Sequence, residues 1–313
     1  MGVPRNGAGD PAPFFYAEAV LRSRIRFAAV VVTPLALLGW FGQTRAHPRP
    51  APVVQQQRRP RVPFRVPAES ELTDSIYRAS AMRGRAILLA TRDSLPRNVG
   101  NSLRCASCHL DGGLRRDAMP WVGSYARFPQ YRPRSGKVDL IEDRINDCLE
   151  RSMNGRRLNP AGRDMHDIVA YFAFLSTGIP VGAEMEGQGF PRLPPMKGDP
   201  ARGKSDFTST CARCHGANGE GTSLAPPLWG SRSYNVGAGM ARITTAASFI
   251  HALMPIDRAR QLSPQQAFDV ATYIDTRSRP DFPRKVRDWP NGGKPPDADY
   301  QLLPPVTSKE KQP

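Results

Sequence analysis

Cysteine and histidine occur twice in one pattern: two thiols separated by two residues, with a histidine directly after the second thiol. The two copies are Cys105-Ala-Ser-Cys108-His109 and Cys211-Ala-Arg-Cys214-His215. This pattern is the attachment signature of c-type haem, in which each thiol forms a thioether and the histidine binds the iron from one side. One Cys-x-x-Cys could be a redox dithiol or half a zinc site. Two copies that both end in histidine favour two covalently bound haems c.

The fifth cysteine, Cys148, has no partner left in the chain once the other four bind haem. It lies 39 positions after His109, and Met254 lies 39 positions after His215. Because the two sulfurs occupy equivalent places, we expect both to bind iron opposite the histidine. The expected iron ligands are therefore His109 with Cys148 and His215 with Met254. A thiolate lowers the haem potential and a thioether raises it.

Both sulfur ligands have alternatives. A methionine is more often a core residue than a ligand, and Met240 and His251 are the other candidates for the second iron. Cys148 could be a buried free thiol or half of a disulfide. The proline that follows Met254 and the equal spacing in the two halves favour iron binding by both sulfurs.

The residues around Cys148 predict a helix over 140–154. Arg144, Cys148 and Ser152 recur at every fourth position and so share one helix face, and Arg151 stands beside them. Guanidinium groups favour the thiolate form of a neighbouring cysteine, and they can hold an oxyanion against it through paired hydrogen bonds. The alternative is a solvated helix face, because acidic residues stand between the arginines.

Two similar units position these groups. Each unit opens with a short helix that contains Arg-Gly, continues with the Cys-x-x-Cys-His motif and closes with a helix whose apolar residues have helical spacing. The matching residues are Arg83-Gly84 and Arg202-Gly203 in the opening helices, and Tyr171 and Tyr273 in the closing helices. Ser263 and Gln266 predict a capped start for the second closing helix. With little strand signal, we expect an all-α protein of two tandem domains that resemble class I cytochrome c.

Changes in composition set the expected boundaries. They predict a signal peptide over 1–46, a Pro- and Arg-rich linker over 47–70, a first domain over 71–180, a linker over 181–197, a second domain over 198–290 and a polar tail over 291–313. The apolar stretch 27–41 has 15 residues, fewer than the roughly 20 that span a bilayer. We therefore expect a cleaved export signal and a periplasmic protein. The alternative is an uncleaved anchor, which would attach the protein to a membrane.

The charge of the chain restricts its partners. The formal net charge is +16 over 313 residues. Such a basic surface suits small anionic substrates and acidic electron-transfer proteins. Lysine and arginine form no stripe on a nucleic-acid-binding motif, so we expect no nucleic-acid partner.

With these residues identified, the stretch 72–290 resembles the dihaem thiosulfate dehydrogenases. The resemblance is carried by CASCHLDGG (105–113), PQYRPRSG (129–136), EDRINDCLERSMNG (142–155) and the shorter segments 226–230 and 237–240. The segment around Cys148 is the specific part, because Cys-x-x-Cys-His occurs in any cytochrome c. In that family the second haem takes a Met or a Lys/Met arrangement, and here Leu253 precedes Met254, so no lysine is available at that adjacent position. The first unit is also similar to the Cys-ligated cytochrome subunit of the sulfur-oxidising multienzyme system.

The resemblance implies an oxidoreductase that joins two thiosulfates into tetrathionate and passes two electrons to a cytochrome or a similar redox protein. It implies catalytic roles for Cys148, for Arg144 and Ser152 on the same helix, and for Arg134 in the upstream loop. We expect Arg134 and Arg144 to hold the sulfonates while Cys148 loosens from iron and bonds to one thiosulfate, which a second thiosulfate then attacks. The alternatives are a pure electron carrier, a subunit of a sulfur-oxidising complex, and a tetrathionate reductase.

Overall fold

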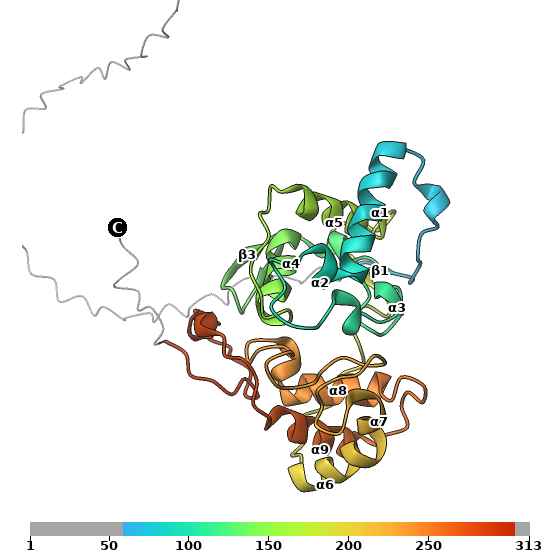
Figure 1. The fold of residues 1–313 in the computed structure, drawn as a ribbon. Helices are drawn as coiled ribbons and strands as arrows, with labels where there is room; N and C mark the ends of the chain where they lie inside the picture. Colours follow the sequence, from blue (N-terminus) through green and yellow to red (C-terminus); the bar gives the residue numbers. More distant parts are fainter. Residues whose placement is uncertain (1–58, 304–313) are drawn as a thin grey trace, which may run out of the picture. The chain divides into compact units, whose positions relative to one another are not determined.

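The computed structural model describes residues 59–303 (Figure 1). The expected signal peptide over 1–46 and the first part of the expected linker lie outside these residues. All of the described residues fall within one of the two units into which the chain divides, Gln56–Pro313. Helices dominate this part of the chain, and its strands form two short two-stranded ladders. No helix among residues 59–303 is long and apolar enough to cross a membrane.

The first domain is organised by the crossing of α1 (Ser75–Leu89) and α5 (Arg163–Phe174) (Figure 1). Gly84 allows the two helices to touch, because a Cβ there would lie 2.0 Å from the carbonyl oxygen of Asp167. Next to it, Arg83 donates to both carboxylate oxygens of Asp167 at 2.8 and 2.9 Å. The other elements are the 3-10 helices Glu69–Glu71, Cys105–Ser107 and Tyr125–Arg127, α2 (Thr91–Ser94), α3 (Leu110–Gly113), α4 (Ile141–Arg151), and β2 (Gln130–Arg132), which pairs antiparallel with β3 (Lys137–Asp139).

The second domain repeats this crossing with α6 (Pro200–Asp206) and α9 (Pro264–Asp275). A Cβ on Gly203 would lie 1.9 Å from the carbonyl oxygen of Asp269, and Arg202 donates to that carboxylate at 2.6 and 2.9 Å. The other elements are the π-helical turn Phe207–Cys211, α7 (Ala212–His215), α8 (Ile243–Leu253) and the 3-10 helices Gly239–Ala241 and Pro283–Arg287.

Each domain has its own apolar core, and a smaller cluster joins the two. The first core contains Trp121, Met165 and Ile168, and the second contains Phe207 and Phe268. The third cluster joins the domains because Leu110 and Ala118 from the first pack with Phe249, Ala252 and Leu253 from α8 of the second. The two haem-binding motifs are therefore held in one packed assembly.

Two segments expected outside the domains are attached to them. β1 (Arg61–Val62), in the first expected linker, pairs in parallel with β4 (Glu184–Met185) in the second. In the expected polar tail, Ala298 is only 2% exposed and the carboxylate of Asp297 accepts from the backbone N–H of Thr244 at 3.0 Å. The described part of that tail, through residue 303, therefore packs against the second domain.

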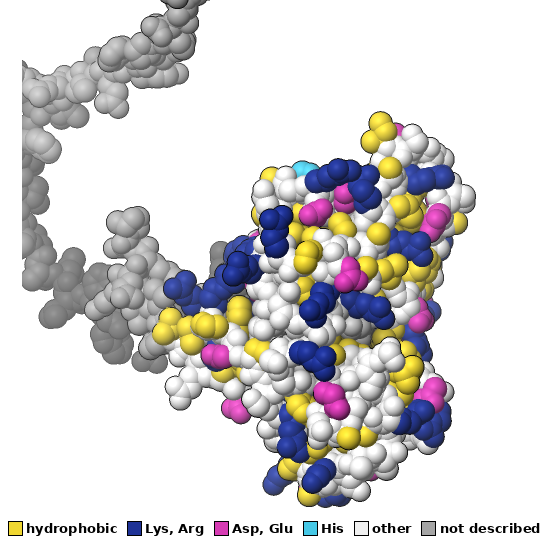
Figure 2. All heavy atoms as spheres, viewed as in Figure 1, with side chains coloured by type: hydrophobic (Ala, Val, Ile, Leu, Met, Phe, Trp, Pro, Cys, Tyr) yellow, Lys and Arg dark blue, Asp and Glu magenta, His cyan; other side chains and the backbone are white. Residues whose placement is uncertain are grey.

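Charged side chains are mixed on the face drawn in Figure 2. Lysine and arginine are spread over both domains there, with acidic and apolar side chains between them, and they form no continuous stripe.

Candidate functional site

Each histidine of the two motifs is fixed by one ring nitrogen. Nδ1 of His109 donates to the carbonyl oxygen of Met119 at 2.5 Å, and Nδ1 of His215 donates to that of Pro226 at 2.8 Å. A proton on Nδ1 leaves the lone pair of Nε2 free for iron, which is how ligating histidines are usually held. Burial lowers the pKa of both imidazoles, that of His109 to about 4, so both are neutral at pH 7.

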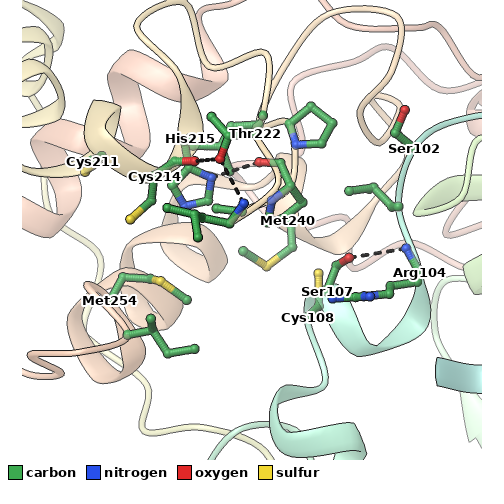
Figure 3. A pocket seen from close by; sticks show the side chains of 18 of the residues that line it. Ser102, Arg104, Ser107, Cys108, Cys211, Cys214, His215, Thr222, Met240 and Met254 are labelled. Atoms are coloured by element: carbon green, nitrogen blue, oxygen red, sulfur yellow. Dashed lines mark hydrogen bonds between the residues drawn. The ribbon is translucent and has the colours of Figure 1, made fainter. Parts of the chain in front are cut away.

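A cavity of about 900 Å³ lies beside the second motif (Figure 3). Cys211, Cys214 and His215 stand on its wall, and Met240 and Met254 project into it from other elements. Its volume is in the range of cofactor pockets, and its two thiols, tethered imidazole and thioethers fit a covalently attached haem.

The same cavity helps to separate the candidates for the second sulfur ligand. His251 is not among the lining residues, and its Nδ1 lies 2.8 Å from the carbonyl oxygen of Leu262. Met254 and Met240 both line the cavity, so the prediction of Met254 stays open to that one alternative. Cys108 of the first motif also lines this cavity, so the two attachment sites share a wall.

Cys148 borders the space next to the first motif. The pKa values of Cys105 and Cys108 are raised to about 12, chiefly by burial and also by the nearby charge of Cys148. The charge of Arg144 likewise contributes to the lowered pKa of His109, after burial. The charge of Cys148 thus acts on both attachment thiols and that of Arg144 on the imidazole, and the pairing of His109 with Cys148 at one iron stays a prediction.

A second cavity, of about 390 Å³, has Cys148 in its wall. All four predicted catalytic residues line it: Cys148, Arg134, Arg144 and Ser152. Among residues 59–303, six arginines and a single acidic residue, Asp147, line this cavity; the arginines are Arg127, Arg132, Arg134, Arg144, Arg151 and Arg242. A space with this wall is suited to small anions with several oxygens.

Helix α4 presents one arginine to the Cys148 sulfur. Nη1 of Arg144 donates to Sγ of Cys148 at 2.7 Å, and the charge of Cys148 raises the pKa of Arg144. Arg151 donates to Asp147 at 2.5 Å and to both oxygens of Asp288 at 2.7 and 2.9 Å. It lines the same cavity as Cys148, but two carboxylates compensate its charge and its guanidinium donates to them, so a direct action of Arg151 on the sulfur stays a prediction.

Three of the cavity arginines lack a carboxylate partner. Arg127, Arg132 and Arg242 form no ion pair with any residue in the described part of the chain, whereas Arg134, Arg144 and Arg151 do. Burial lowers the pKa of the three unpaired guanidinium groups. A desolvated cation without a counter-ion is unfavourable, so a bound anion would stabilise this wall.

Sequence reasoning missed these three residues as site residues. Arg127 ends the 3-10 helix Tyr125–Arg127 and Arg132 ends β2, both in the arginine-rich segment before α4, and Arg242 directly follows the 3-10 helix Gly239–Ala241. The sequence feature that could have identified these three residues is the local density of arginine near the segments that carry the family resemblance. Arg144 and Ser152 can be identified by their helical spacing from Cys148, but the three missed arginines lie on other elements, where that spacing does not apply.

The end of the described chain forms another wall of the same cavity. Trp289 lines it, and the guanidinium of Arg134 lies 4.8 Å from the centre of the Trp289 ring. The backbone N–H of Trp289 donates to the carbonyl oxygen of Arg134 at 2.9 Å, and Nη1 of Arg134 donates to the carbonyl oxygen of Gly237 at 2.9 Å. Arg134, on the first domain, is thus held by groups of the second domain and the chain end.

Comparisons with known proteins agree with these observations. The family model described as "SoxA/TsdA, cytochrome c domain" matches residues 97–181, and the one described as "Cytochrome C oxidase, cbb3-type, subunit III" matches residues 198–274. Both halves of the chain thus match cytochrome c families, which confirms the predicted fold of two tandem cytochrome c domains.

Three proteins that match this chain over most of its length are all thiosulfate dehydrogenases. The thiosulfate dehydrogenase of Psychrobacter arcticus is 41% identical over 241 residues, which cover 75% of this chain and 74% of that protein. The thiosulfate dehydrogenase of Allochromatium vinosum is 42% identical over 247 residues, covering 75% and 92%. The "as isolated" structure of the thiosulfate dehydrogenase TsdBA from Marichromatium purpuratum is 40% identical with a TM-score of 0.67, covering 71% of this chain. The match spans half (50%) of that longer chain.

Proposed function

The chain belongs to the thiosulfate dehydrogenase family and is an oxidoreductase with cytochrome c domains, and from this premise we propose that it joins two thiosulfates into tetrathionate at Cys148. The observation that carries the proposal is the arginine-lined cavity that contains Cys148 in its wall. A protein that only carries electrons has no need for a cationic cavity at a distal sulfur. Substrates that carry sulfonate groups do need one.

Two haems c, attached at Cys105 and Cys108 with His109 and at Cys211 and Cys214 with His215, would supply the one-electron acceptors for this reaction. The protein residues would prepare the sulfur chemistry. Arg144 already donates to the Cys148 sulfur at 2.7 Å and so stabilises negative charge on it. Arg127 and Arg132, which lack carboxylate partners in the described residues, can hold the sulfonate of the first thiosulfate beside Arg144.

The first step forms one sulfur–sulfur bond. The Cys148 thiolate and the terminal sulfur of one thiosulfate join, and two electrons leave the pair of sulfurs. The adduct is Cys148-S–S–SO₃⁻, which keeps the sulfonate between the arginines. The hydroxyl of Ser152 lines the same cavity and can donate to a sulfonate oxygen.

The second step is an exchange in which no further electrons are released. The terminal sulfur of a second thiosulfate attacks the adduct sulfur that bears the sulfonate, and the bond to Cys148 breaks. Tetrathionate leaves with its two charges, and Cys148 returns as a thiolate beside Arg144. The guanidinium that stabilises the attacking thiolate in the first step thus also stabilises the leaving thiolate in the second.

The electrons would leave from the second domain to an acidic redox protein such as a cytochrome. Leu224 and Ile256 line the 900 Å³ cavity and are 77% and 55% exposed, so they mark its opening to solvent. Arginines line the same cavity together with three acidic residues; the arginines are Arg92, Arg104, Arg213 and Arg232. Exposed apolar side chains with charged residues around them suit a transient redox partner, and the net charge of +16 favours an acidic one. The export signal predicted over 1–46 supports action in the periplasm.

The test is thiosulfate-dependent reduction of ferricyanide by the purified protein, with tetrathionate assayed as the product. Cys148→Ala is measured beside the native protein, and haem content and chemical reducibility are checked in both. We expect turnover by the native protein and its loss in the variant. Full turnover by Cys148→Ala would exclude the covalent step. No turnover by a native protein whose haems are both reducible would exclude the proposed function.

A further inference from the structure

We propose that the second domain supplies a separate subsite for the second sulfonate, with Arg242 and Arg134 as its anchors. The inference rests on the proposed function, because it concerns how two thiosulfates share one cavity. It assigns a substrate-binding role to Arg242, a residue of the domain that does not carry Cys148.

The cavity arginines fall into two groups. Arg144 donates to the Cys148 sulfur at 2.7 Å, and Arg127 and Arg132 line the same cavity from the 3-10 helix Tyr125–Arg127 and from β2 of the first domain. Arg134 donates to the carbonyl oxygen of Gly237 at 2.9 Å, and its guanidinium lies 4.8 Å from the centre of the Trp289 ring. Arg134 is thus held by groups of the second domain, the domain from which Arg242 comes.

The end of the described chain lies beside Arg134. The ring of Tyr300 lies 6.0 Å from that of Trp289, and the Arg134 guanidinium lies 4.8 Å from the centre of the Trp289 ring. The hydroxyl of Tyr300 donates to Asp288 at 2.7 Å, and Asp288 is also the bidentate partner of Arg151. Arg134 and Arg242 line the cavity together with Trp289, although they come from different domains.

Arg242 has donors available for a ligand. It is the residue before α8, and its Nε is buried without a hydrogen-bond partner in the described residues. Asp297 is the acidic group that acts on Arg242, but that carboxylate accepts from the backbone N–H of Thr244 and forms no ion pair with Arg242. The positive charge of Arg192 lowers the pKa of Arg242 further, in addition to burial. A buried donor without a partner is unfavourable, and a sulfonate oxygen would satisfy it.

The substrate pair needs two such places. Two thiosulfates carry four negative charges, and tetrathionate has one sulfonate at each end of a four-sulfur chain. Two sulfonates in one place would repel each other strongly in a partly buried site. A second anchor on the far side of the cavity lets the second thiosulfate approach the adduct with its terminal sulfur leading. A cavity with arginines from both domains therefore matches a product that has a sulfonate at each end.

The experiment separates adduct formation from turnover. Arg242→Gln is compared with the native protein and with Arg192→Gln, which removes a neighbouring charge that does not line the cavity. Intact-mass spectrometry after exposure to thiosulfate and ferricyanide measures the adduct on Cys148. Steady-state tetrathionate formation measures the complete cycle. Haem content and thermal unfolding confirm that both variants fold.

We expect Arg242→Gln to form the adduct like the native protein while its kcat/KM for thiosulfate falls about 10- to 100-fold, as loss of a charged hydrogen bond predicts. Arg192→Gln should keep nearly native kcat/KM. Arg242→Lys, which keeps the charge but not the planar fork, should lie between the two. Native kcat/KM in Arg242→Gln would overturn the subsite, and so would loss of the adduct in that variant. If the native protein forms neither adduct nor tetrathionate, the proposed function itself fails.

Discussion

The two domains share a scaffold and differ at the distal sulfur. In each, a glycine lets the opening helix touch the closing helix, an arginine next to it holds a buried aspartate, and a backbone carbonyl fixes the histidine through Nδ1. The corresponding residues are Gly84, Arg83, Asp167 and His109 in the first domain and Gly203, Arg202, Asp269 and His215 in the second. These features would position a haem in either domain, and they do not determine the function of that haem.

The difference between the domains lies in the surroundings of Cys148 and Met254. Cys148 is in the wall of a cavity with six arginines, whereas Met254 packs among the apolar residues of the second core and of the cluster between the domains. The cavity at Cys148 has six arginines and one acidic residue in its wall, whereas the cavity into which Met254 projects has four arginines and three acidic residues, so the excess of positive charge is much larger at the first sulfur. We infer that a cytochrome c domain becomes a substrate site through its distal segment, while the proximal half stays unchanged.

The largest effect is expected when the distal sulfur of the first domain is replaced by that of the second. We expect Cys148→Met to lower tetrathionate formation by roughly 10³-fold or more, because a thioether cannot form the adduct and loss of a nucleophile is severe. The potential of the first haem should rise, since methionine replaces a thiolate. Turnover and a spectroelectrochemical titration measure the two effects.

The reciprocal variant, Met254→Cys, is the control. It should lower the potential of the second haem while the adduct still forms at Cys148. If Cys148→Met kept more than a tenth of native turnover, the distal sulfur would not distinguish the domains as we infer.

The shared scaffold is tested by adding one methyl group to each helix crossing. Gly84→Ala and Gly203→Ala would place a Cβ 2.0 and 1.9 Å from a backbone oxygen of the closing helix, so the helices must separate. We expect each variant to lose about 3 kcal/mol of unfolding free energy, the upper end of overpacking costs. Denaturant unfolding followed by circular dichroism measures the loss.

A matched glycine is available for this test. Gly239 has no neighbouring atom within 4 Å of an added Cβ, and Gly239→Ala should unfold at nearly the native denaturant concentration. A native midpoint in Gly84→Ala with a large loss in Gly203→Ala would show that the two crossings are not equivalent.

Features that depend on local chemistry can be predicted from the sequence. Haem attachment requires two thiols and a histidine at fixed spacing, so the amino-acid order alone reveals both motifs and the internal repeat. The sequence also predicts the capped start of α9, where the hydroxyl of Ser263 accepts from the backbone N–H of Gln266 at 3.2 Å. Helix periodicity places Arg144, Cys148 and Ser152 on one face, and all three line the anion cavity.

Features that depend on distant pairing cannot be predicted in this way. The helix pattern predicts Arg151 beside Cys148, but Arg151 is held by Asp288, a residue 137 positions later. Arg242 reaches the cavity from the second domain, and Trp289 lies beyond the expected closing helix. The expected tail contains Tyr300, which donates to Asp288. No periodicity links these residues, because the cavity is assembled only when the two domains pack together.

The smallest expected difference between the domains is in how much the buried aspartates, Asp167 and Asp269, contribute to stability. Burial alone would raise the pKa of Asp167 and of Asp269, but hydrogen bonds from Arg83 and Ser80, and from Arg202 and the backbone N–H of Asp199, hold both below their ordinary value. A carboxylate with a lowered pKa stabilises the fold above its ordinary pKa of about 4, and this stability is lost as the pH falls through the folded value.

We therefore expect Asp167→Asn and Asp269→Asn each to lose about 2 kcal/mol at pH 7, the range of hydrogen bonds to charged groups. The difference from the native protein should begin to shrink below about pH 4, where these carboxylates become protonated in the unfolded state, and should shrink further as the pH falls through the lower pKa values of the folded state. Asp269 should show the larger loss, because it accepts from Asp199 at 2.7 Å and Gln265 at 2.8 Å in addition to Arg202. Unfolding free energies measured at pH 7 and pH 3 decide this. A loss that is the same at both pH values would mean that the charge of these aspartates contributes nothing, and that the hydrogen-bond geometry alone holds the paired helices.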